Sequence, residues 1–198
     1  MDVRTCAVAV AAIAVLVAGC SSGREVNTSD APAPTQGGAA APPPPSKRPS
    51  NENLANAFDF YAESNGRMGY YFTSPSKRWT CAIFPREEAG CQSSTGSAIP
   101  VKGAPASVTD AQGKDKVPNA IRVERETDAG FGSLDPPGYT LVPGPPVVLP
   151  FKKVLIVAGF RCNVQEASGI SCLSELTGKG FTFSADGYTL QYTDLPAS

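Results

Sequence analysis

The chain of 198 residues contains no histidine. Histidine is the side chain most often used as a general base near neutral pH, and it is the commonest metal ligand. A histidine-dependent catalytic triad cannot be built within this chain, and a zinc site would have to use thiolates or carboxylates alone. We therefore expect no catalytic residues, no metal site and no cofactor.

A strong charge of either sign is also missing. The chain has 17 Lys and Arg against 18 Asp and Glu, which gives a formal net charge of −1. Nucleic-acid-binding domains carry an excess of basic residues on one face, so we expect no nucleic-acid partner. Apolar runs long enough to span a membrane are absent as well. Crossing a bilayer requires ~20 apolar residues, and the longest run after the first twenty residues, 154–158, has only the length of a strand.

The first twenty residues have the pattern of an export signal. Arg4 precedes an uncharged apolar stretch over residues 6–18, which is the length of a signal-peptide core. Val17, Ala18, Gly19 and Cys20 follow and resemble the lipobox of bacterial lipoproteins. We expect residues 1–19 to be removed and Cys20 to carry the lipid; the alternative is an ordinary secretory signal in which Cys20 is incidental.

A lipidated Cys20 has consequences for location. Each buried methylene is worth ~0.8 kcal/mol, so two or more acyl chains on one residue hold a protein firmly on a membrane. This predicts a protein anchored to the extracytoplasmic side of the cell membrane, with the membrane as its first partner. Cys6 lies within the predicted signal peptide and would have no role in the mature fold.

Residues 20–66 are predicted to be a disordered tether rich in Pro and Ala, with four consecutive prolines at 42–45. Such a composition cannot bury enough apolar surface to offset the entropy lost on ordering. Within it, Leu54, Ala57, Phe58 and Tyr61 have helical spacing and predict one short helix over 53–62. The folded domain is expected to span 67–198.

Four cysteines remain in this domain, namely Cys81, Cys91, Cys162 and Cys172. An even number of cysteines in an exported chain predicts disulfides, and four allow three pairings. A hairpin that joins Cys81 to Cys91 places an apolar pair two residues inside the bond, and a hairpin joining Cys162 to Cys172 does the same. This favours the two cross-hairpin bonds over swapped pairing (Cys81 with Cys162, Cys91 with Cys172) and over a four-cysteine zinc site, which usually has C-x2-C spacing.

The remaining pattern is typical of β structure. Strands are expected at 70–72, 79–83, 154–164, 181–184 and 188–192, with apolar residues of the last two on one face. Residues 97–150 are rich in Pro and Gly and predict turns. The two cysteine units also match as a weak internal repeat, Trp79-x-Cys81-x-Ile83 with Phe160-x-Cys162-x-Val164. The fold class predicted is mainly β: a small disulfide-stapled antiparallel sheet or sandwich-like domain after a disordered tether.

Several motifs resemble an uncharacterised family of secreted and lipid-anchored actinobacterial envelope proteins of mycobacterial type. In the first half they are Phe72-Thr-Ser-Pro-Ser76, Trp79-Thr-Cys81 and Cys91; in the second half they are Gly159-Phe-Arg-Cys162, Cys172 and 177–181. The resemblance covers residues 70–192 and departs at Lys77 and Arg78, where the family has Gly and Asn. It implies a location in a Gram-positive envelope and assigns no activity.

Candidate ligand contacts are the aromatic residues Trp79, Tyr70, Tyr71 and Tyr139, which could form a platform for a sugar or peptide; a core position is the alternative for each. The function predicted is a non-enzymatic binding or interaction module whose partner is an envelope polymer or protein. The alternative is a small histidine-independent hydrolase or transferase that uses carboxylates, for example Glu87 with Glu88 or Glu124 with Glu126.

Overall fold

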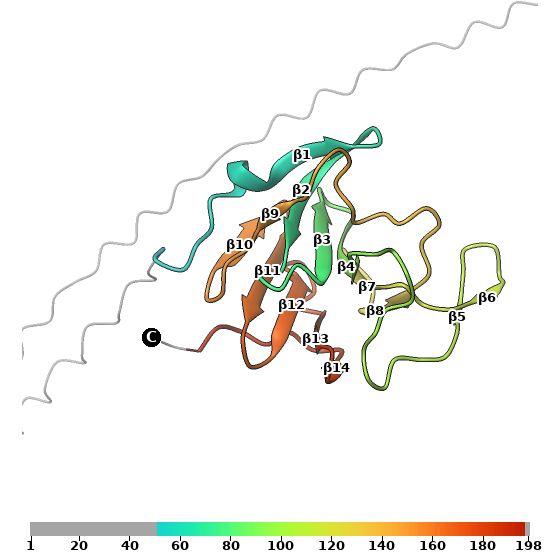
Figure 1. Cartoon of the computed structure of the whole chain (residues 1–198). Helices are drawn as coiled ribbons and strands as arrows, with labels where there is room; N and C mark the ends of the chain where they lie inside the picture. Colours follow the sequence, from blue (N-terminus) through green and yellow to red (C-terminus); the bar gives the residue numbers. More distant parts are fainter. Residues whose placement is uncertain (1–50, 197–198) are drawn as a thin grey trace, which may run out of the picture. The chain divides into compact units, whose positions relative to one another are not determined.

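A computed structural model describes residues 51–196 of the chain (Figure 1). The predicted signal peptide, Cys20 and most of the predicted tether lie outside the described residues. Within them the regular structure is almost entirely β, with antiparallel sheets and two disulfides, which confirms the predicted mainly β fold class.

Two large sheets build the domain. Sheet 1 has the order β1-β2-β3-β4-β7-β8, and β9 pairs with β2 as its parallel strand. Its strands are β1 (Tyr61–Ser64), β2 (Arg67–Thr73), β3 (Trp79–Phe84), β4 (Glu88–Ser93), β7 (Ala120–Glu124), β8 (Gly130–Gly132) and β9 (Val147–Val148).

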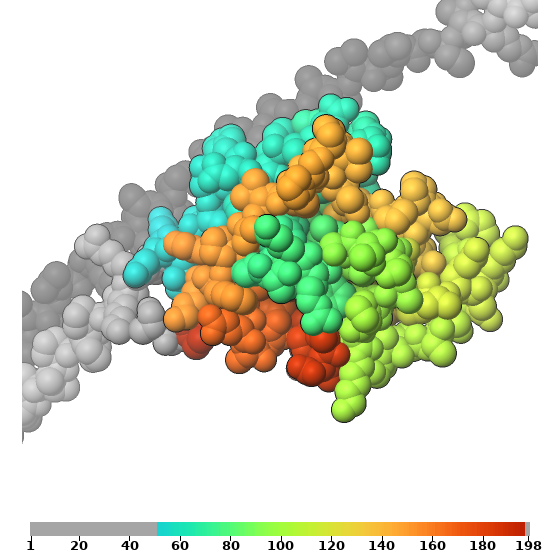
Figure 2. All heavy atoms as spheres, in the orientation of Figure 1, coloured from blue at the N-terminus to red at the C-terminus, as the bar shows by residue number. Residues whose placement is uncertain are grey.

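Sheet 2 is a meander, with the order β10-β11-β12-β13-β14. Its strands are β10 (Val154–Val157), β11 (Phe160–Gln165), β12 (Gly169–Ser174), β13 (Gly180–Ser184) and β14 (Gly187–Thr189). A separate two-stranded ribbon of β5 (Val108–Thr109) and β6 (Asp115–Lys116) extends beside sheet 1, in yellow-green in Figures 1 and 2.

The inner faces of the two sheets share one apolar core, so the domain is a β-sandwich. A matched row of fully buried residues crosses four neighbouring strands in each sheet. The row of sheet 1 is Phe72, Cys81, Cys91 and Ile121, and the row of sheet 2 is Leu155, Cys162, Cys172 and Phe181. The two cysteine units that match in the sequence thus occupy corresponding positions in the two sheets of the core.

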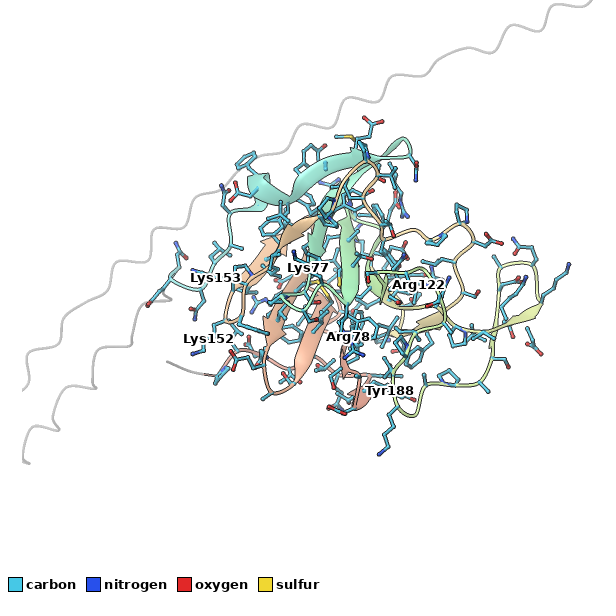
Figure 3. The ribbon with its side chains drawn as sticks, in the orientation of Figure 1. Lys77, Arg78, Arg122, Lys152, Lys153 and Tyr188 are labelled. Atoms are coloured by element: carbon cyan, nitrogen blue, oxygen red, sulfur yellow. A yellow bond between two sulfur atoms is a disulfide. The ribbon has the colours of Figure 1, made fainter. Side chains whose placement is uncertain are left out.

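Some tight turns use residues other than glycine in the left-handed region. Lys77, in the turn between β2 and β3, has φ +57°, and Lys152, before β10, has φ +62°. Both side chains are labelled in Figure 3. The left-handed conformation costs a residue with a Cβ on the order of 1–2 kcal/mol in steric energy. Glycine at either lysine position would adopt the same turn without this strain.

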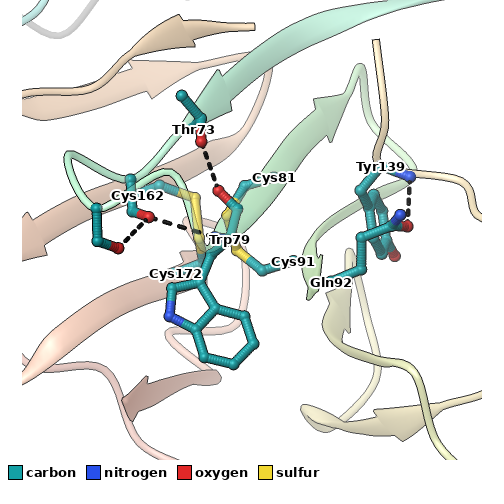
Figure 4. The surroundings of a disulfide bond; sticks show 10 residues. Thr73, Trp79, Cys81, Cys91, Gln92, Tyr139, Cys162 and Cys172 are labelled. Carbon is teal, nitrogen blue, oxygen red and sulfur yellow. Dashed lines mark hydrogen bonds between the residues drawn. A yellow bond between two sulfur atoms is a disulfide. The ribbon is translucent and has the colours of Figure 1, made fainter. Parts of the chain in front are cut away.

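The disulfides join Cys81 to Cys91 and Cys162 to Cys172 across the hairpins β3–β4 and β11–β12. The bonded cysteines face each other in register with Cα atoms 4.0 and 4.2 Å apart. All four are fully buried in the shared core, beside Trp79 (Figure 4). The pairing is therefore the cross-hairpin arrangement, not the swapped one.

The predicted boundary of the tether at residue 66 is wrong. Residues 57–60 form a 3-10 helix, η1 (Ala57–Phe60), and β1 pairs with β2 along its whole length. The side chain of Asn56 caps η1 by accepting from the Phe58 N–H, and Tyr61 already has extended backbone, so the expected helix over 53–62 is shortened to one turn. The buried ring of Phe60 is what binds this segment to the core.

Two strands also differ from expectation. The strand expected over 154–164 is a hairpin, because Ala158 and Gly159 both take positive φ and turn the chain between β10 and β11. The strand expected over 188–192 ends at Thr189, and Tyr192 lies on the opposite, outer face of sheet 2, where its hydroxyl accepts from Asn163 Nδ2 at 2.8 Å. Buried polar residues on that face hold the chain end by hydrogen bonds to 191–194.

Candidate functional site: a groove under a proline-rich loop

The outer face of sheet 1 is covered by residues 133–148, here called the covering loop. It contains no regular structure before β9 and has cis peptide bonds before Pro136 and Pro143. Beneath it lies a second, smaller core made of Tyr71, Ala82, Phe84, Ala120 and Tyr139. In Figure 2 the gold residues of this part of the chain lie beside the green residues of the central strands.

Side chains from sheet 1 hold the covering loop in place. Gln92 accepts from the Tyr139 N–H at 2.9 Å (Figure 4). It also donates to Thr140 Oγ1 at 2.7 Å. Ser64 donates to the Thr140 carbonyl and accepts from the Val142 N–H. Asn119 makes two bonds of 2.8 Å with the backbone of Leu134. Except for the side-chain bond to Thr140 Oγ1, each of these bonds satisfies a backbone group that regular structure leaves unpaired, so the loop is a fixed wall.

A groove runs along the covering loop as a row of three pockets, with volumes of about 680, 320 and 400 Å³. The pockets share residues: Pro136 and Pro137 line the first two, and Ser94 and Thr140 line the second and third. Volumes of this size are those of small-molecule sites. The largest pocket carries charges of both signs, including Asp110, Asp135 and Lys114.

The third pocket, here called the hydroxyl pocket, differs in its chemistry. Its walls carry four hydroxyl groups, from Thr73, Thr80, Ser94 and Thr140. The rings of Pro145 and Pro146 form an apolar side, and Lys77 is the one charged residue that lines it. The pocket is therefore lined by hydroxyl-bearing residues, prolines and a single lysine.

The hydroxyl of Thr80, although the residue lines this pocket, is not open to it. The residue is 6% exposed, and its Oγ1 is buried without a hydrogen-bond partner among residues 51–196. Thr73 Oγ1, by contrast, donates to the Trp79 carbonyl at 2.8 Å. A buried hydroxyl without a partner costs about 1–3 kcal/mol, and because Thr80 Oγ1 is closed to water-sized groups, it is no contact point for a ligand in the pocket.

A cluster of five charged residues occupies the other end of the same face. Glu88, whose side chain is 9% exposed, binds Arg67 at 3.2 Å and Arg122 at 3.0 Å through different oxygens. Glu87 and Glu124 bind the outer sides of these arginines. Burial by itself lowers the pKa of Arg122. The negative charges of Glu88 and Glu124 have a larger, opposite effect, so the pKa of Arg122 is raised. The carboxylates named as catalytic candidates at 87, 88 and 124 are thus all engaged by arginines.

Tyr139 lies between this cluster and the sheet. Its ring stacks on Phe84 with centroids 5.9 Å apart, and the guanidinium of Arg67 lies over the same Phe84 ring at 3.2 Å. Burial raises the pKa of the Tyr139 hydroxyl well above its ordinary value, and the negative charge of Glu88 adds to the rise. A proton held this firmly does not act in acid–base chemistry near neutral pH.

The aromatic residues proposed as a ligand platform do not form one. Trp79 packs edge-on against Phe183 between the sheets, and Tyr71 packs edge-on against Phe84 under the covering loop. Trp79, Tyr71 and Tyr139 are buried, and Tyr70 is half-buried against Tyr61. Alternation explains this: Tyr70 and Tyr71 are neighbours on one strand and point to opposite faces.

The groove residues were missed by sequence reasoning because they are small and polar. Thr73 and Thr80 are cross-strand partners, and this relation depends on the register of β2 and β3. The turn that carries Lys77 could be predicted from Pro75 and the flanking strands, but its position beside a pocket could not. A usable signal was the run Pro143-Gly-Pro-Pro146, which now proves to be the wall of the hydroxyl pocket.

No group of Cys, Asp and Glu in the described part of the chain is arranged to hold a metal ion. No helix between residues 51 and 196 is long and apolar enough to cross a membrane. Comparison with protein-family models, with curated proteins and with solved structures gives no match. The fold and the groove thus define the chain as a disulfide-stapled β-sandwich with a loop-walled surface groove.

Proposed function

We propose that this protein is a lipid-anchored lipoprotein of the cell envelope whose β-sandwich binds an envelope polymer or protein in the groove beneath the covering loop, without catalysing a reaction. The sequence pattern that ends at Cys20 supports the anchor. The observation that carries the binding function is the covering loop itself, fixed over a groove by the side chains of Ser64, Gln92 and Asn119.

A groove that exists before the ligand arrives favours binding, because little conformational entropy remains to be lost when the ligand enters. The three pockets follow one another along the loop and suit an extended ligand better than a compact one. Hydroxyl and amide side chains supply hydrogen bonds along this path, and the prolines supply apolar contact.

The carboxylate chemistry of a hydrolase has less support. A glycosidase needs one carboxylic acid to give a proton and one carboxylate to act as base or nucleophile. Here Glu88 is held between two guanidinium groups, and Glu87 and Glu124 are each paired with one of them. The arrangement fits a structural ion-pair cluster that closes one end of the sheet.

The test is binding of the full chain, solubilised in detergent, to purified insoluble envelope polysaccharide, measured by co-sedimentation. Ser94 is exposed and lines two of the three pockets, so Ser94→Trp should block the groove without disturbing the core. Ser97→Trp is the matched control, since Ser97 is exposed and lies outside these pockets. Equal binding by both variants would contradict the proposal, and so would steady hydrolysis of the polymer by the wild-type chain.

A further inference from the structure

The apolar residues that predicted a helix before the first strand do not all serve the core. Leu54, Ala57, Phe58 and Tyr61 have helical spacing in the sequence, yet of the four only Ala57 packs against the shared core. The other three are exposed, and the side chain of Phe58 is 88% exposed. Packing inside the domain therefore does not account for the apolar side chain of Phe58, and accounts only in part for Leu54 and Tyr61.

The geometry of η1 directs Phe58 away from the domain. In a 3-10 helix, side chains three residues apart lie on the same side, so Ala57 and Phe60 both face the core. Phe58 lies between them in the sequence and points outward. The cap of η1 uses only the backbone N–H of residue 58, so a polar residue would serve this turn equally well. The exposed ring is thus free to contact something outside the domain.

Neighbouring residues extend this ring into a patch. Residues 53–55 pair with Val154 through two backbone hydrogen bonds of 2.8 Å, and Lys153 Nζ donates to the Glu52 carbonyl at 2.6 Å. The segment before η1 and the turn before β10 therefore lie side by side, in cyan and orange at the left of Figure 2. The exposed and half-buried members of this edge are here called the edge patch: Leu54, Phe58, Tyr61, Phe151, Lys152 and Lys153.

The edge patch combines apolar side chains with cations. Lys152 and Lys153 both lie on this side of the domain (Figure 3), and among residues 51–196 neither makes an ion pair. The neighbouring carboxylate of Asp59 accepts from Asn56 Nδ2 at 3.1 Å. Phe and Leu side chains beside lysines are the combination by which proteins bind the interface of a membrane, with rings at the headgroup level and ammonium groups at the phosphates.

The chain that precedes the patch determines which surface the patch meets. The described chain begins at residue 51, three residues before Leu54. Residues 21–50 separate it from Cys20, the proposed site of the lipid. Even fully extended, a chain of this length spans only about 100 Å. An anchored domain therefore meets the membrane at a high effective concentration, so a patch of modest affinity is enough to hold it there.

We propose that the edge patch rests on the surface of the lipid bilayer, with the rings of Phe58 and Phe151 among the headgroups and the two lysines against lipid phosphates. The inference rests on the proposed function, because it needs the anchor at Cys20. None of the patch residues lines the three pockets of the groove. Docking in this way therefore leaves the groove open to its ligand.

The experiment places a tryptophan in the patch and asks whether lipid reaches it. The acylated full chain is reconstituted into vesicles of phosphatidylglycerol and brominated phosphatidylcholine, since bromine quenches tryptophan that enters the headgroup region. Phe58→Trp should lose most of the emission that the added tryptophan contributes. The native Trp79 is buried in the core and gives the same background in every variant.

Val117→Trp is the matched control. Val117 is 61% exposed and follows the β5–β6 ribbon, far from η1 (Figure 1). Its emission should be the same in brominated and unbrominated vesicles. Equal quenching of the Val117→Trp and Phe58→Trp chains, or quenching of neither, would overturn the inference.

Charge variants test the lysines. In the Phe58→Trp chain, Lys152→Gln should reduce quenching in vesicles that contain phosphatidylglycerol, because the attraction between ammonium and phosphate is lost. Lys102→Gln should not, since Lys102 is an exposed lysine at the opposite edge of sheet 2, where its N–H donates to the Ala185 carbonyl. Equal effects of the two changes would overturn the contact between Lys152 and the lipid.

A second copy of the chain is the other occupant that the patch could take. Sedimentation of the chain in detergent tests it: a dimer that Phe58→Ser converts to a monomer would overturn the lipid contact and assign the patch to self-association. Phe58→Ser should leave the fold intact, because the side chain is outside the core.

Failure of the docking remains distinct from failure of the proposed function. An acylated chain whose Phe58→Trp variant is not quenched would reject the docking alone, and polymer binding in the groove would stand unaffected. A chain that carries no acyl group would reject both the anchor and the docking.

Discussion

The ring of Tyr139 occupies the space above Gly90 where any other residue would place its side chain. A Cβ atom built at position 90 would overlap the Cζ and hydroxyl of Tyr139. Because Gly90, in the middle of β4, has no side chain, the covering loop can lie close against the sheet at this position.

The first prediction concerns this contact. Gly90→Ala should lower the free energy of unfolding by about 1–3 kcal/mol, because the ring must move out of a packed site. Denaturant unfolding measures the change. Gly130→Ala is the control, since the space around Gly130 is open and its φ is not in the left-handed region. Similar stability for the two variants would mean that Tyr139 does not rest against the sheet.

The second prediction concerns the disulfides. Each bond closes a loop of about 11 residues, for which chain entropy gives somewhat less than about 3 kcal/mol. Reduction should therefore lower the melting temperature sharply, since a small domain has only about 5–15 kcal/mol in total. Replacing one pair, Cys81→Ala with Cys91→Ala, should cause a smaller fall than replacing both pairs. Peptide mapping without reduction should find Cys81 with Cys91 and Cys162 with Cys172; fragments that join 81 to 162 would contradict the structure.

The third prediction concerns alkaline pH. Burial raises the pKa of Tyr192 to about 12 from an ordinary 10.0, so the folded state keeps a proton that the unfolded chain loses first. Stability from this group is complete below pH 10 and is lost as the pH rises to about 12. Tyr71 and Tyr139, whose pKa values burial also raises, act in the same direction. Unfolding measured across this range should become easier with pH, and less steeply so in Tyr192→Phe than in Tyr188→Phe. Equal slopes would show that Tyr192 is exposed in solution.

The fourth prediction concerns the anchor. Cys20→Ala should abolish labelling of the protein by a fatty-acid analogue and release it from the membrane fraction or leave it unprocessed, because its thiol is the proposed site of acylation. Cys6→Ala is the control and should leave labelling unchanged, since that residue lies in the predicted signal peptide. Labelling that persists in Cys20→Ala would reject the lipobox interpretation.

Local relationships in the chain were predictable, and long-range ones were not. The bond between Cys162 and Cys172 follows from alternation within a single hairpin, so the facing pair Val164 and Ile170 was enough to predict it. Phe60 and β1 were assigned to the tether because the composition of this segment gives no sign of order. Their burial comes from pairing with β2 and from packing on the core, and neither can be read from composition. The strand expected over 154–164 failed at Ala158, where an ordinary residue adopts a turn conformation that favours glycine.

The groove was unpredictable for the same physical reason. Its wall is held by bonds between residues far apart in the sequence, such as Ser64 with Thr140 and Gln92 with Tyr139. Each of these residues is unremarkable in isolation, since Ser, Thr and Gln occur on most protein surfaces. Tyr139 was a candidate ligand contact because it is aromatic, yet the covering loop carries its ring into a second core.

The matched rows that face each other across the sandwich have a consequence for how the protein can evolve. Phe72, Cys81 and their counterparts lie on the inner faces, whereas the residues that seat the covering loop lie outside these rows. Mutations that reshape the groove need not touch the packing that keeps the domain folded. A change in the covering loop can therefore alter the shape of the groove while both stapled hairpins and their shared core stay as they are.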